Sequence, residues 1–262
     1  MKYRFRDRVA GQIARVRSNA RSAVREVRNR RAARFRTSFD ISRALTFYSE
    51  LIRPGDLCFD IGANVGDRTA LFLSLGARVV AVEPQPGCVA ILRERFAPDD
   101  VQVLAQGLGR RSGSAPLVVN RSNSGLSTMS ERWRRDRFPE DAWAEPIEVP
   151  ISTLDDLVKS FGLPAFCKID VEGYEREVLA GLSSPLPMLS IEFTGIFLDD
   201  LKSNLAHLER LAPIEVNCVL YEQMRFALAR WTDRAEVEGF LEGRAMKDEV
   251  LSGDVYVRQQ NP

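Results

Sequence analysis

The segment FDIGANVGDRT, residues 59–69, decides the fold class of this 262-residue chain. It reads as the end of an apolar strand that carries Asp60, followed by a loop in which Gly62 and Gly66 stand four positions apart and open a helix. Glycine lets the backbone turn sharply and lets a ligand approach the main chain closely. In a doubly wound sheet such a turn lies at the carboxyl end of the first strand, where ligands bind. A tight turn without a ligand is the alternative that this loop alone leaves open.

Short, continuously apolar segments alternate with helical segments along the rest of the chain. The strands that we expect are 57–61, 79–82, 101–104, 166–170, 189–193, 216–221 and 254–257. The helices that we expect are 41–52, 68–75, 89–96, 154–161, 175–182 and 198–211. Strands that are apolar throughout are typical of a parallel sheet covered on both faces. The pattern therefore predicts an α/β fold with a doubly wound, mostly parallel sheet and an antiparallel last strand.

Residues 106–150 interrupt this alternation. We expect a strand at 116–120 and a loop rich in Ser, Gly and Asn at 122–130, where Ser124 is a candidate substrate contact. The stretch 132–143 mixes arginines with aromatic residues and could form a lid over a substrate. A surface insertion without such a role is the alternative, because connecting segments commonly vary at the surface.

Composition narrows the class of protein. Hydrophobic residues make up 45% and charged residues 28% of the chain, which excludes a disordered, a collagen-like or a disulfide-scaffold protein. The four cysteines form no CxxC or Cys/His cluster, which indicates buried, reduced thiols rather than zinc ligands. No run approaches the roughly 20 apolar residues that span a bilayer. No apolar region follows the N-terminal charges as in a secretory signal. We therefore expect a cytoplasmic protein.

The net charge of +1 conceals a basic arm. Residues 1–40 hold 13 Lys/Arg and 3 Asp/Glu, whereas the remaining residues hold 24 and 33. Apolar residues at helical spacing predict an amphipathic helical arm over 1–38, in front of a domain at 39–262. Its partner could be an anionic membrane surface, bound through residues 1–36 at the inner membrane face, or nucleic acid, which we rank lower. Docking on the body of the protein or on a second copy of the chain is the alternative.

A second acidic residue follows the next strand. Glu83 ends the apolar run 79–82 and stands 21 residues after Gly62. An acidic residue at this place can accept hydrogen bonds from both hydroxyls of an adenosine ribose. An NAD-dependent dehydrogenase shares this arrangement and stays as an alternative. However, Asn64 replaces the middle glycine of the dinucleotide fingerprint, and Asp60 would repel a pyrophosphate but suit an ammonium or a sulfonium. The pair therefore predicts an adenosyl cofactor and argues against NAD.

Four motifs resemble one known family. They are DIGANVG at 60–66, AVEP at 81–84, TLDD at 153–156 and KIDVEG at 168–173. Across about residues 55–195, their order and spacing are similar to those of the FkbM family of S-adenosylmethionine-dependent methyltransferases. The resemblance implies a class I, Rossmann-like methyltransferase domain over 39–262. It also implies that S-adenosylmethionine is bound by Asp60, Gly62, Asn64, Gly66, Glu83 and Gln106.

The same resemblance places Asp170 and Glu172 beside the transferring methyl group as catalytic residues. Two positions apart on an extended strand, their side chains would point to the same side. Mutual repulsion would raise the pKa of one of them and give a general base for an alcohol acceptor. Alternatively, Glu172 caps the helix that begins near Tyr174, and Asp170 only accepts hydrogen bonds.

Two neighbouring residues complete the candidate site. Glu192, at the end of the 189–193 strand, could contact substrate or join Asp170 and Glu172 around a divalent cation. We do not favour the cation, because such carboxylates are often only hydrogen-bonded, and we assign no metal ligand. Lys168 lies within an apolar strand and is either a substrate contact or, as we prefer, a partner in a structural ion pair.

The resemblance implies O-methylation of a hydroxyl on a sugar, a glycolipid or a secondary metabolite. N- and carboxyl methylation stay open. So does a different class of protein, an inactive methyltransferase fold that the basic arm anchors to a membrane or to nucleic acid. The expected partners are a small-molecule or glycan acceptor and a second copy of the chain.

Overall fold

The computed structural model describes residues 41–248 and 250–260. The predicted helical arm at 1–38 lies outside the described residues. The arm's predicted membrane and nucleic-acid partners therefore stay predictions.

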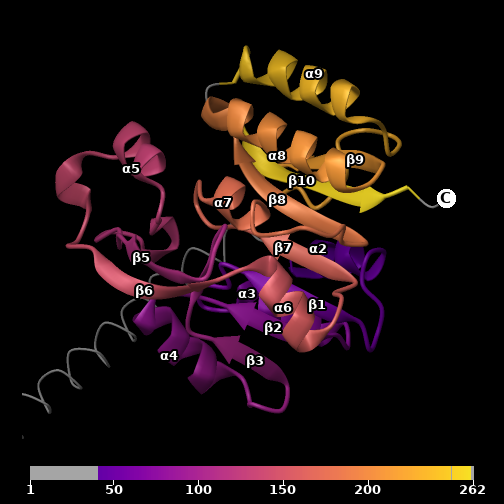
Figure 1. The fold of residues 1–262 in the computed structure, drawn as a ribbon. Helices are drawn as coiled ribbons and strands as arrows, with labels where there is room; N and C mark the ends of the chain where they lie inside the picture. Colours follow the sequence, from indigo (N-terminus) through magenta and orange to yellow (C-terminus); the bar gives the residue numbers. More distant parts are fainter. Residues whose placement is uncertain (1–40, 249, 261–262) are drawn as a thin grey trace, which may run out of the picture. The chain divides into compact units, whose positions relative to one another are not determined.

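A seven-stranded sheet organises the described part of the chain (Figure 1). In spatial order its strands are β3 (Val101–Leu104), β2 (Arg78–Val82), β1 (Leu57–Ile61), β7 (Phe166–Ile169), β8 (Met188–Thr194), β10 (Ser252–Gln259) and β9 (Ile214–Leu220). Neighbours from β3 to β8 run parallel, and β10 is antiparallel to both β8 and β9. This confirms the predicted mostly parallel sheet with an antiparallel last strand. The chain order reverses between β1 and β7, and ligands bind at such a reversal in a doubly wound sheet.

Helices connect these strands and cover them (Figure 1). They are α2 (Ile41–Ser49), α3 (Asp67–Ser74), α4 (Pro86–Arg95), α6 (Leu154–Phe161), α7 (Glu175–Leu179), α8 (Leu198–Leu211) and α9 (Arg234–Ala245). α6 has the predicted bounds, because Thr153 caps it by accepting a hydrogen bond from a backbone N–H of the first turn. α9 was not predicted, since Gly239 and Gly243 disfavour a helix. Asp233 caps α9 in the same way as Thr153 caps α6.

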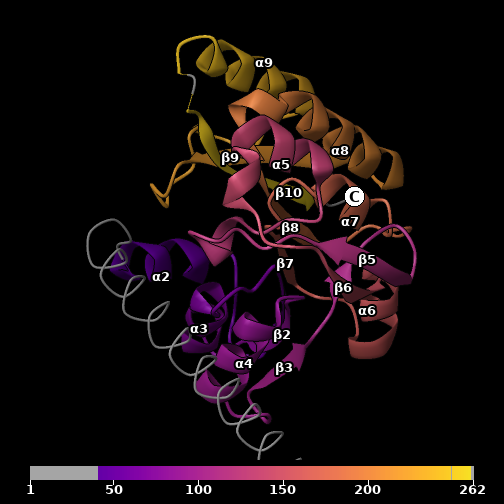
Figure 2. The same cartoon turned by 90° about the vertical axis from the view of Figure 1, so that its left-hand side faces the viewer.

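A second, three-stranded sheet occupies the stretch that interrupts the alternation. Its order is β4 (Gly107–Leu108), β6 (Ile147–Ser152) and β5 (Gly113–Leu117). The predicted strand at 116–120 is therefore shifted, because β5 pairs with β6 through residues 113–117. Between β5 and β6 the chain forms a short 3-10 turn, η1 (Ser124–Leu126), and the helix α5 (Glu131–Arg137). Both views show α5 on the side of the small sheet that faces α7 and α8 (Figures 1 and 2).

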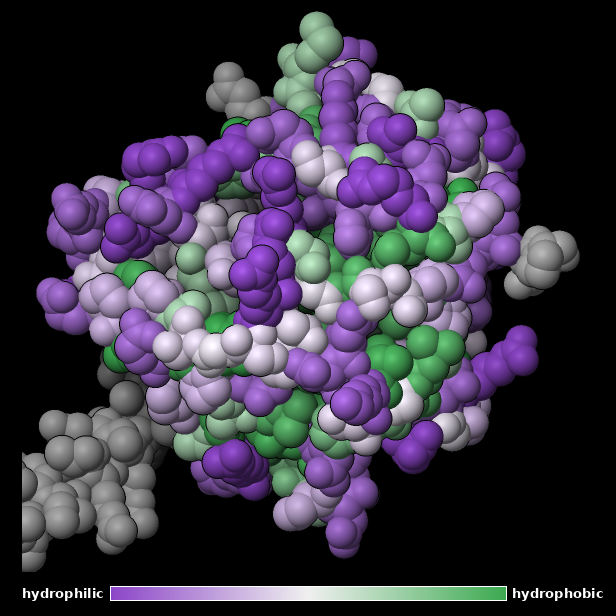
Figure 3. Space-filling view, viewed as in Figure 1, coloured by the Kyte–Doolittle hydropathy of each residue, from purple (hydrophilic) through white to green (hydrophobic). Residues whose placement is uncertain are grey.

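Burial agrees with the compositional expectations. All residues of β1 and β7 are buried, and the four cysteines are buried and unpaired, as predicted. In the view of Figure 3 the surface is mostly hydrophilic, with apolar areas between polar side chains. Over residues 41–248 and 250–260, no helix has the length and apolar character needed to cross a bilayer.

Candidate active site

The loop between β1 and α3 has a left-handed backbone at three positions. Gly62, Asn64 and Gly66 have φ of 81°, 53° and 84°. Asn is one of the few residues with a side chain that tolerates this region, which explains how Asn64 replaces a glycine. A Cβ on Gly62 would lie 1.8 Å from the carbonyl oxygen of Asp170. The glycine therefore lets the loop pack against the segment after β7. From the sequence we expect a ligand to approach the main chain closely at Gly62, but here the backbone of Asp170 does so.

Glu83 follows β2, and its side chain is hydrogen-bonded to the glycine loop. Its Oε2 accepts a hydrogen bond from the backbone N–H of Asn64 at 2.7 Å, and its Oε1 accepts one from the N–H of Gln85 at 2.8 Å. Its side chain is buried. Burial raises the pKa of Glu83 to about 7, although the two backbone N–H groups oppose the rise. The Glu83 carboxyl therefore changes charge near neutral pH.

Asp60 lies inside the protein at the level of the glycine loop. Its Oδ2 accepts a hydrogen bond of 2.6 Å from the hydroxyl of Thr69, which lies on α3. Burial raises the pKa of Asp60, whereas Thr69 and the charge of Lys168 lower it. Asp60 and Lys168 stand opposite each other on β1 and β7. The role near a cofactor ammonium stays a prediction.

Lys168 is almost completely buried and forms two ion pairs. Its Nζ lies 3.0 Å from Oδ2 of Asp170 and 3.1 Å from Oδ1 of Asp254, which comes from β10. Burial alone would lower the pKa of Lys168, but the two carboxylates raise it well above the ordinary value. Lys168 therefore stays positively charged, in the structural ion pair that we preferred over contact with substrate.

Three carboxyl groups gather after β7 and on β8. One oxygen from each of Asp170, Glu172 and Glu192 lies within 4.8 Å of the other two, and we call these residues the acid cluster. Burial raises the pKa of Glu172 and of Glu192, and the charge of Asp170 raises both further, to well above the ordinary value. For Asp170 burial is opposed by Lys168 and by a hydrogen bond from Glu192, and its pKa is lowered. The surroundings thus favour the ionised form of Asp170 and the neutral forms of Glu172 and Glu192.

The backbone around this cluster corrects one prediction. β7 ends at Ile169, and Glu172 has a φ of 53°, so Asp170 and Glu172 do not share the face of an extended strand. A left-handed turn brings their carboxyl groups together instead. The side chain of Asp170 is 34% exposed. The protein therefore surrounds the cluster closely but leaves Asp170 open to a ligand.

Glu175, to which the sequence analysis gave no role at the site, holds this turn. Its Oε1 accepts hydrogen bonds from the N–H groups of Val171 at 3.1 Å and Gly173 at 3.2 Å. Burial raises the pKa of Glu175 to about 7. The alternative in which Glu172 caps the next helix is wrong, because the cap position is Tyr174 and no side chain caps it. An acidic residue two positions after a glycine turn is the signal that could have revealed Glu175.

Trp133 on α5 also contacts the turn and was not singled out. A Cβ on Gly173 would lie 2.8 Å from Cβ of Trp133. Thr128 donates a hydrogen bond of 2.7 Å to the carbonyl of Glu172 and accepts one of 2.8 Å from the N–H of Ser130, the cap of α5. The segment before α5 is therefore tied to the acid cluster.

The remaining predicted residues lie on the other side of the site. Gln106 is half-buried between β3 and β4, so its predicted position near an adenine stays a prediction. Ser124 lies in η1, and its carbonyl accepts a hydrogen bond of 2.9 Å from Nε2 of Gln85. Gln85 thus links the predicted substrate contact Ser124 to Glu83.

The arrangement defines a class of protein. A glycine loop after β1, an acidic residue after β2 and carboxyl groups after β7 line the reversal point of a Rossmann-like sheet, which is where such folds bind cofactors. The model of the Methyltransferase FkbM domain matches residues 60–234. The chain belongs to this family and has the class I methyltransferase fold that the four motifs implied.

Two characterised relatives are similar to this chain. The hexuronic acid methyltransferase AglP of Haloferax volcanii is 30% identical over 152 residues, covering 54% of this chain and 56% of the relative. The 31-O-demethyl-FK506 methyltransferase FkbM of Streptomyces tacrolimicus is 33% identical over 161 residues, covering 50% and 61%. The match thus covers less than two thirds of either relative.

Among solved structures, a TehB-like SAM-dependent methyltransferase from Corynebacterium glutamicum is similar, with a TM-score of 0.48 and 11% identity over 92% of this chain and 99% of the other.

Proposed function

We propose that this chain is an S-adenosylmethionine-dependent O-methyltransferase whose acceptor is a hydroxyl on a sugar, a glycolipid or a secondary metabolite. The names of the two characterised relatives support this choice, because one acts on a hexuronic acid and the other on the 31-O position of demethyl-FK506. Family membership supports the methyl transfer itself.

The residues present fit the cofactor. Each oxygen of Glu83 accepts one backbone N–H, so each keeps a lone pair that a ribose hydroxyl can use. The loop from Gly62 to Gly66 would hold the methionine part. Asp170, whose lowered pKa favours its ionised form, lies next to this loop, and its negative charge favours a positively charged ligand. S-adenosylmethionine supplies a methyl group on a positively charged sulfur.

The acid cluster can handle the proton of the acceptor. An alcohol that forms a bond to carbon loses its proton, and a positioned base assists this step. Asp170 is ionised, partly exposed and held in place by Lys168, so its carboxylate can take that proton at neutral pH. The raised pKa of Glu172 and of Glu192 favours their neutral forms, which can hydrogen-bond to the acceptor. The remaining task of the protein is to align the acceptor with the methyl group.

One observation carries the proposal. Gly62 packs directly on the carbonyl of Asp170, so the loop expected to hold the cofactor is contiguous with an ionised carboxylate. The three carboxyl groups, once all are ionised, would suit a divalent cation.

Calorimetry with S-adenosylmethionine and with NAD, followed by transfer of a labelled methyl group to hydroxyl-bearing acceptors, tests the function. We expect binding of S-adenosylmethionine only, and label in an ether that resists mild alkaline hydrolysis. Tighter binding of NAD, or label that alkali releases as from a carboxyl ester, contradicts the proposal.

A further inference from the structure

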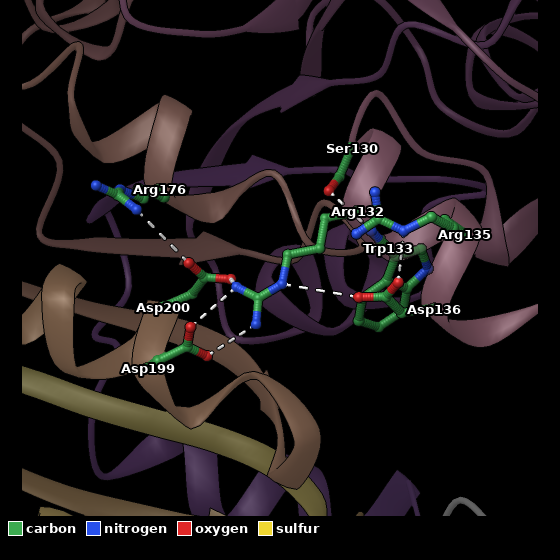
Figure 4. Close-up of polar contacts among 8 residues, drawn as sticks. All are labelled: Ser130, Arg132, Trp133, Arg135, Asp136, Arg176, Asp199 and Asp200. Carbon is green, nitrogen blue, oxygen red and sulfur yellow. Dashed lines mark hydrogen bonds and ion pairs between the residues drawn. The ribbon is translucent and has the colours of Figure 1, made fainter.

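Ion pairs join Arg132 on helix α5 to the first turn of α8 (Figure 4). Nη1 of Arg132 lies 3.0 Å from Oδ2 of Asp199 and 2.7 Å from Oδ2 of Asp200, in the first turn of α8. At the start of α5, Ser130 accepts a hydrogen bond of 3.1 Å from the N–H of Trp133. The ring of Trp133 packs at a tilt on Phe197, with 5.5 Å between centroids. These contacts hold α5 and Trp133 in a defined position.

Arg137, at the end of the same helix, contacts an aromatic ring, whereas Arg132 forms ion pairs. Its guanidinium stacks on the ring of Trp133 at 4.5 Å from the centroid. Within the described part of the chain, no ion pair or hydrogen bond of its guanidinium is found. Burial and the charge of Asp170 raise the pKa of Glu172, and Arg137 is the first of the charges that lower it. Arg137 is therefore a positioned cation near the acid cluster whose N–H groups are available to a ligand.

A small pocket lies beside Trp133. It is lined by Trp133, Glu192 and Thr194 among others. The indole Nε1 of Trp133 and Oγ1 of Thr194 are buried, and the described residues offer neither a hydrogen-bond partner. Its volume of about 20 Å³ is the space of one hydroxyl group or one water molecule. Surrounding side chains close both atoms off, so the pocket contributes shape beside Trp133 and no hydrogen bond to a ligand.

We propose that Arg137 binds an anionic group of the acceptor, a carboxylate or a phosphate, and thereby selects acidic hydroxyl-bearing acceptors. A guanidinium presents its N–H donors as a planar fork that matches either anion. Stacking on the fixed ring of Trp133 orients that fork before the ligand arrives, which lowers the entropy lost on binding. The inference rests on the proposed function and names the acceptor class of the same site.

Matched pairs of ligands test this selection. The probes are methyl β-glucuronide against methyl β-glucoside, and glucose 6-phosphate against glucose, each titrated into protein saturated with S-adenosylhomocysteine. Within a pair the ligands differ mainly in the anionic group. We expect at least one anionic member to bind about tenfold or more tightly than its neutral twin, the size of a hydrogen bond to a charged group. The pair that shows the preference distinguishes a carboxylate from a phosphate.

Three variants locate the effect. R137Q should remove the preference, and R137K should keep part of it, because lysine retains the charge but lacks the fork. R134Q is the matched control on the same helix and should keep the full preference. Thermal unfolding of each variant verifies the fold, and the indole N–H signal of Trp133 in NMR should shift on binding in the wild type.

Every outcome decides the proposal. No binding of either anionic probe to the wild type, equal affinity within both pairs, or a preference that survives in R137Q would overturn it. A loss of S-adenosylmethionine affinity in R137Q would show that Arg137 serves the cofactor instead. Failure of the wild type to bind S-adenosylmethionine refutes the proposed function, whereas normal cofactor binding without an anion preference refutes only the role of Arg137.

Discussion

Glu83 and Glu172 both follow parallel strands and both have a raised pKa, but for different reasons. Burial raises the pKa of Glu83, and hydrogen bonds from backbone N–H groups limit the rise. Burial also raises the pKa of Glu172, where repulsion by Asp170 and Glu175 adds to the effect. Backbone N–H donors hold the Glu83 carboxyl in one position, which suits binding of a cofactor. Repulsion between neighbouring carboxyl groups changes their pKa values, which suits proton transfer in the acid cluster.

D170N should produce the largest effect, because it removes the one member of the acid cluster that is kept ionised. We expect turnover to fall by about 10²–10⁴-fold, the usual contribution of a general base, with unchanged affinity for S-adenosylmethionine. D254N is the matched control, since Asp254 is the other partner of Lys168. If D254N loses as much turnover as D170N, only the ion pair matters and the proposed base is wrong.

E83Q should act on binding instead of turnover. A glutamine can accept one of the two backbone hydrogen bonds, but its NH₂ group opposes the other N–H and cannot accept from a ribose hydroxyl. Affinity for S-adenosylmethionine should fall by about 10–100-fold, the range for hydrogen bonds to a charged group, as measured by calorimetry. D67N, which removes a carboxylate paired with Arg95 at the surface, should leave the affinity unchanged.

The pH dependence of cofactor binding should reveal Glu83 directly. With a pKa of about 7, Glu83 gains its charge between pH 6 and pH 8, and the ionised form is the better acceptor. Affinity should therefore rise about tenfold over this interval in the wild type and stay level in E83Q.

Stability should change in the opposite direction over a wider pH range. Because the folded-state pKa of Glu83 lies above its ordinary value of 4.5, the folded protein binds this proton more tightly than the unfolded chain. The free energy of unfolding that Glu83 contributes is therefore largest below pH 4.5 and is lost as the pH rises towards 7. Denaturant unfolding of the wild type and E83Q measures the difference, and parallel pH curves for the two proteins would contradict this assignment.

E192Q should have the smallest effect. The raised pKa of Glu192 favours its neutral form, which can donate a hydrogen bond to Asp170, and glutamine is also neutral and can donate. We expect turnover to change by less than about twofold, since an isosteric neutral group replaces a neutral acid. A large loss that added Mg²⁺ partly restores would instead favour the cation alternative.

The sequence was informative where local signals agree with the fold. The strands of the large sheet are continuous apolar runs, and α6 has a capping threonine, so both could be predicted. The position of β10 between β8 and β9 could not, because the order of strands in a sheet is set by packing between distant segments. α9 was not predicted, because the two glycines in its sequence disfavour a helix.

The candidate site divides in the same way. Motif spacing brought Asp60, Glu83 and Asp170 to one edge of the sheet. It gave the wrong geometry for Glu172, because a left-handed backbone at a residue other than glycine has no strong sequence signal. Trp133 and Arg137 come from the stretch between β5 and β6, and only the folded chain shows that this stretch contacts the turn at Gly173.

The contact between Gly173 and Trp133 has a consequence for protein engineering. Any side chain at position 173 would collide with the tryptophan, and its φ of 87° already disfavours other residues. A helix α5 that carried another side chain at position 133 would therefore meet a turn shaped to fit tryptophan. Chimaeras that exchange the segment between β5 and β6 should therefore exchange the KIDVEG turn at 168–173 together with it.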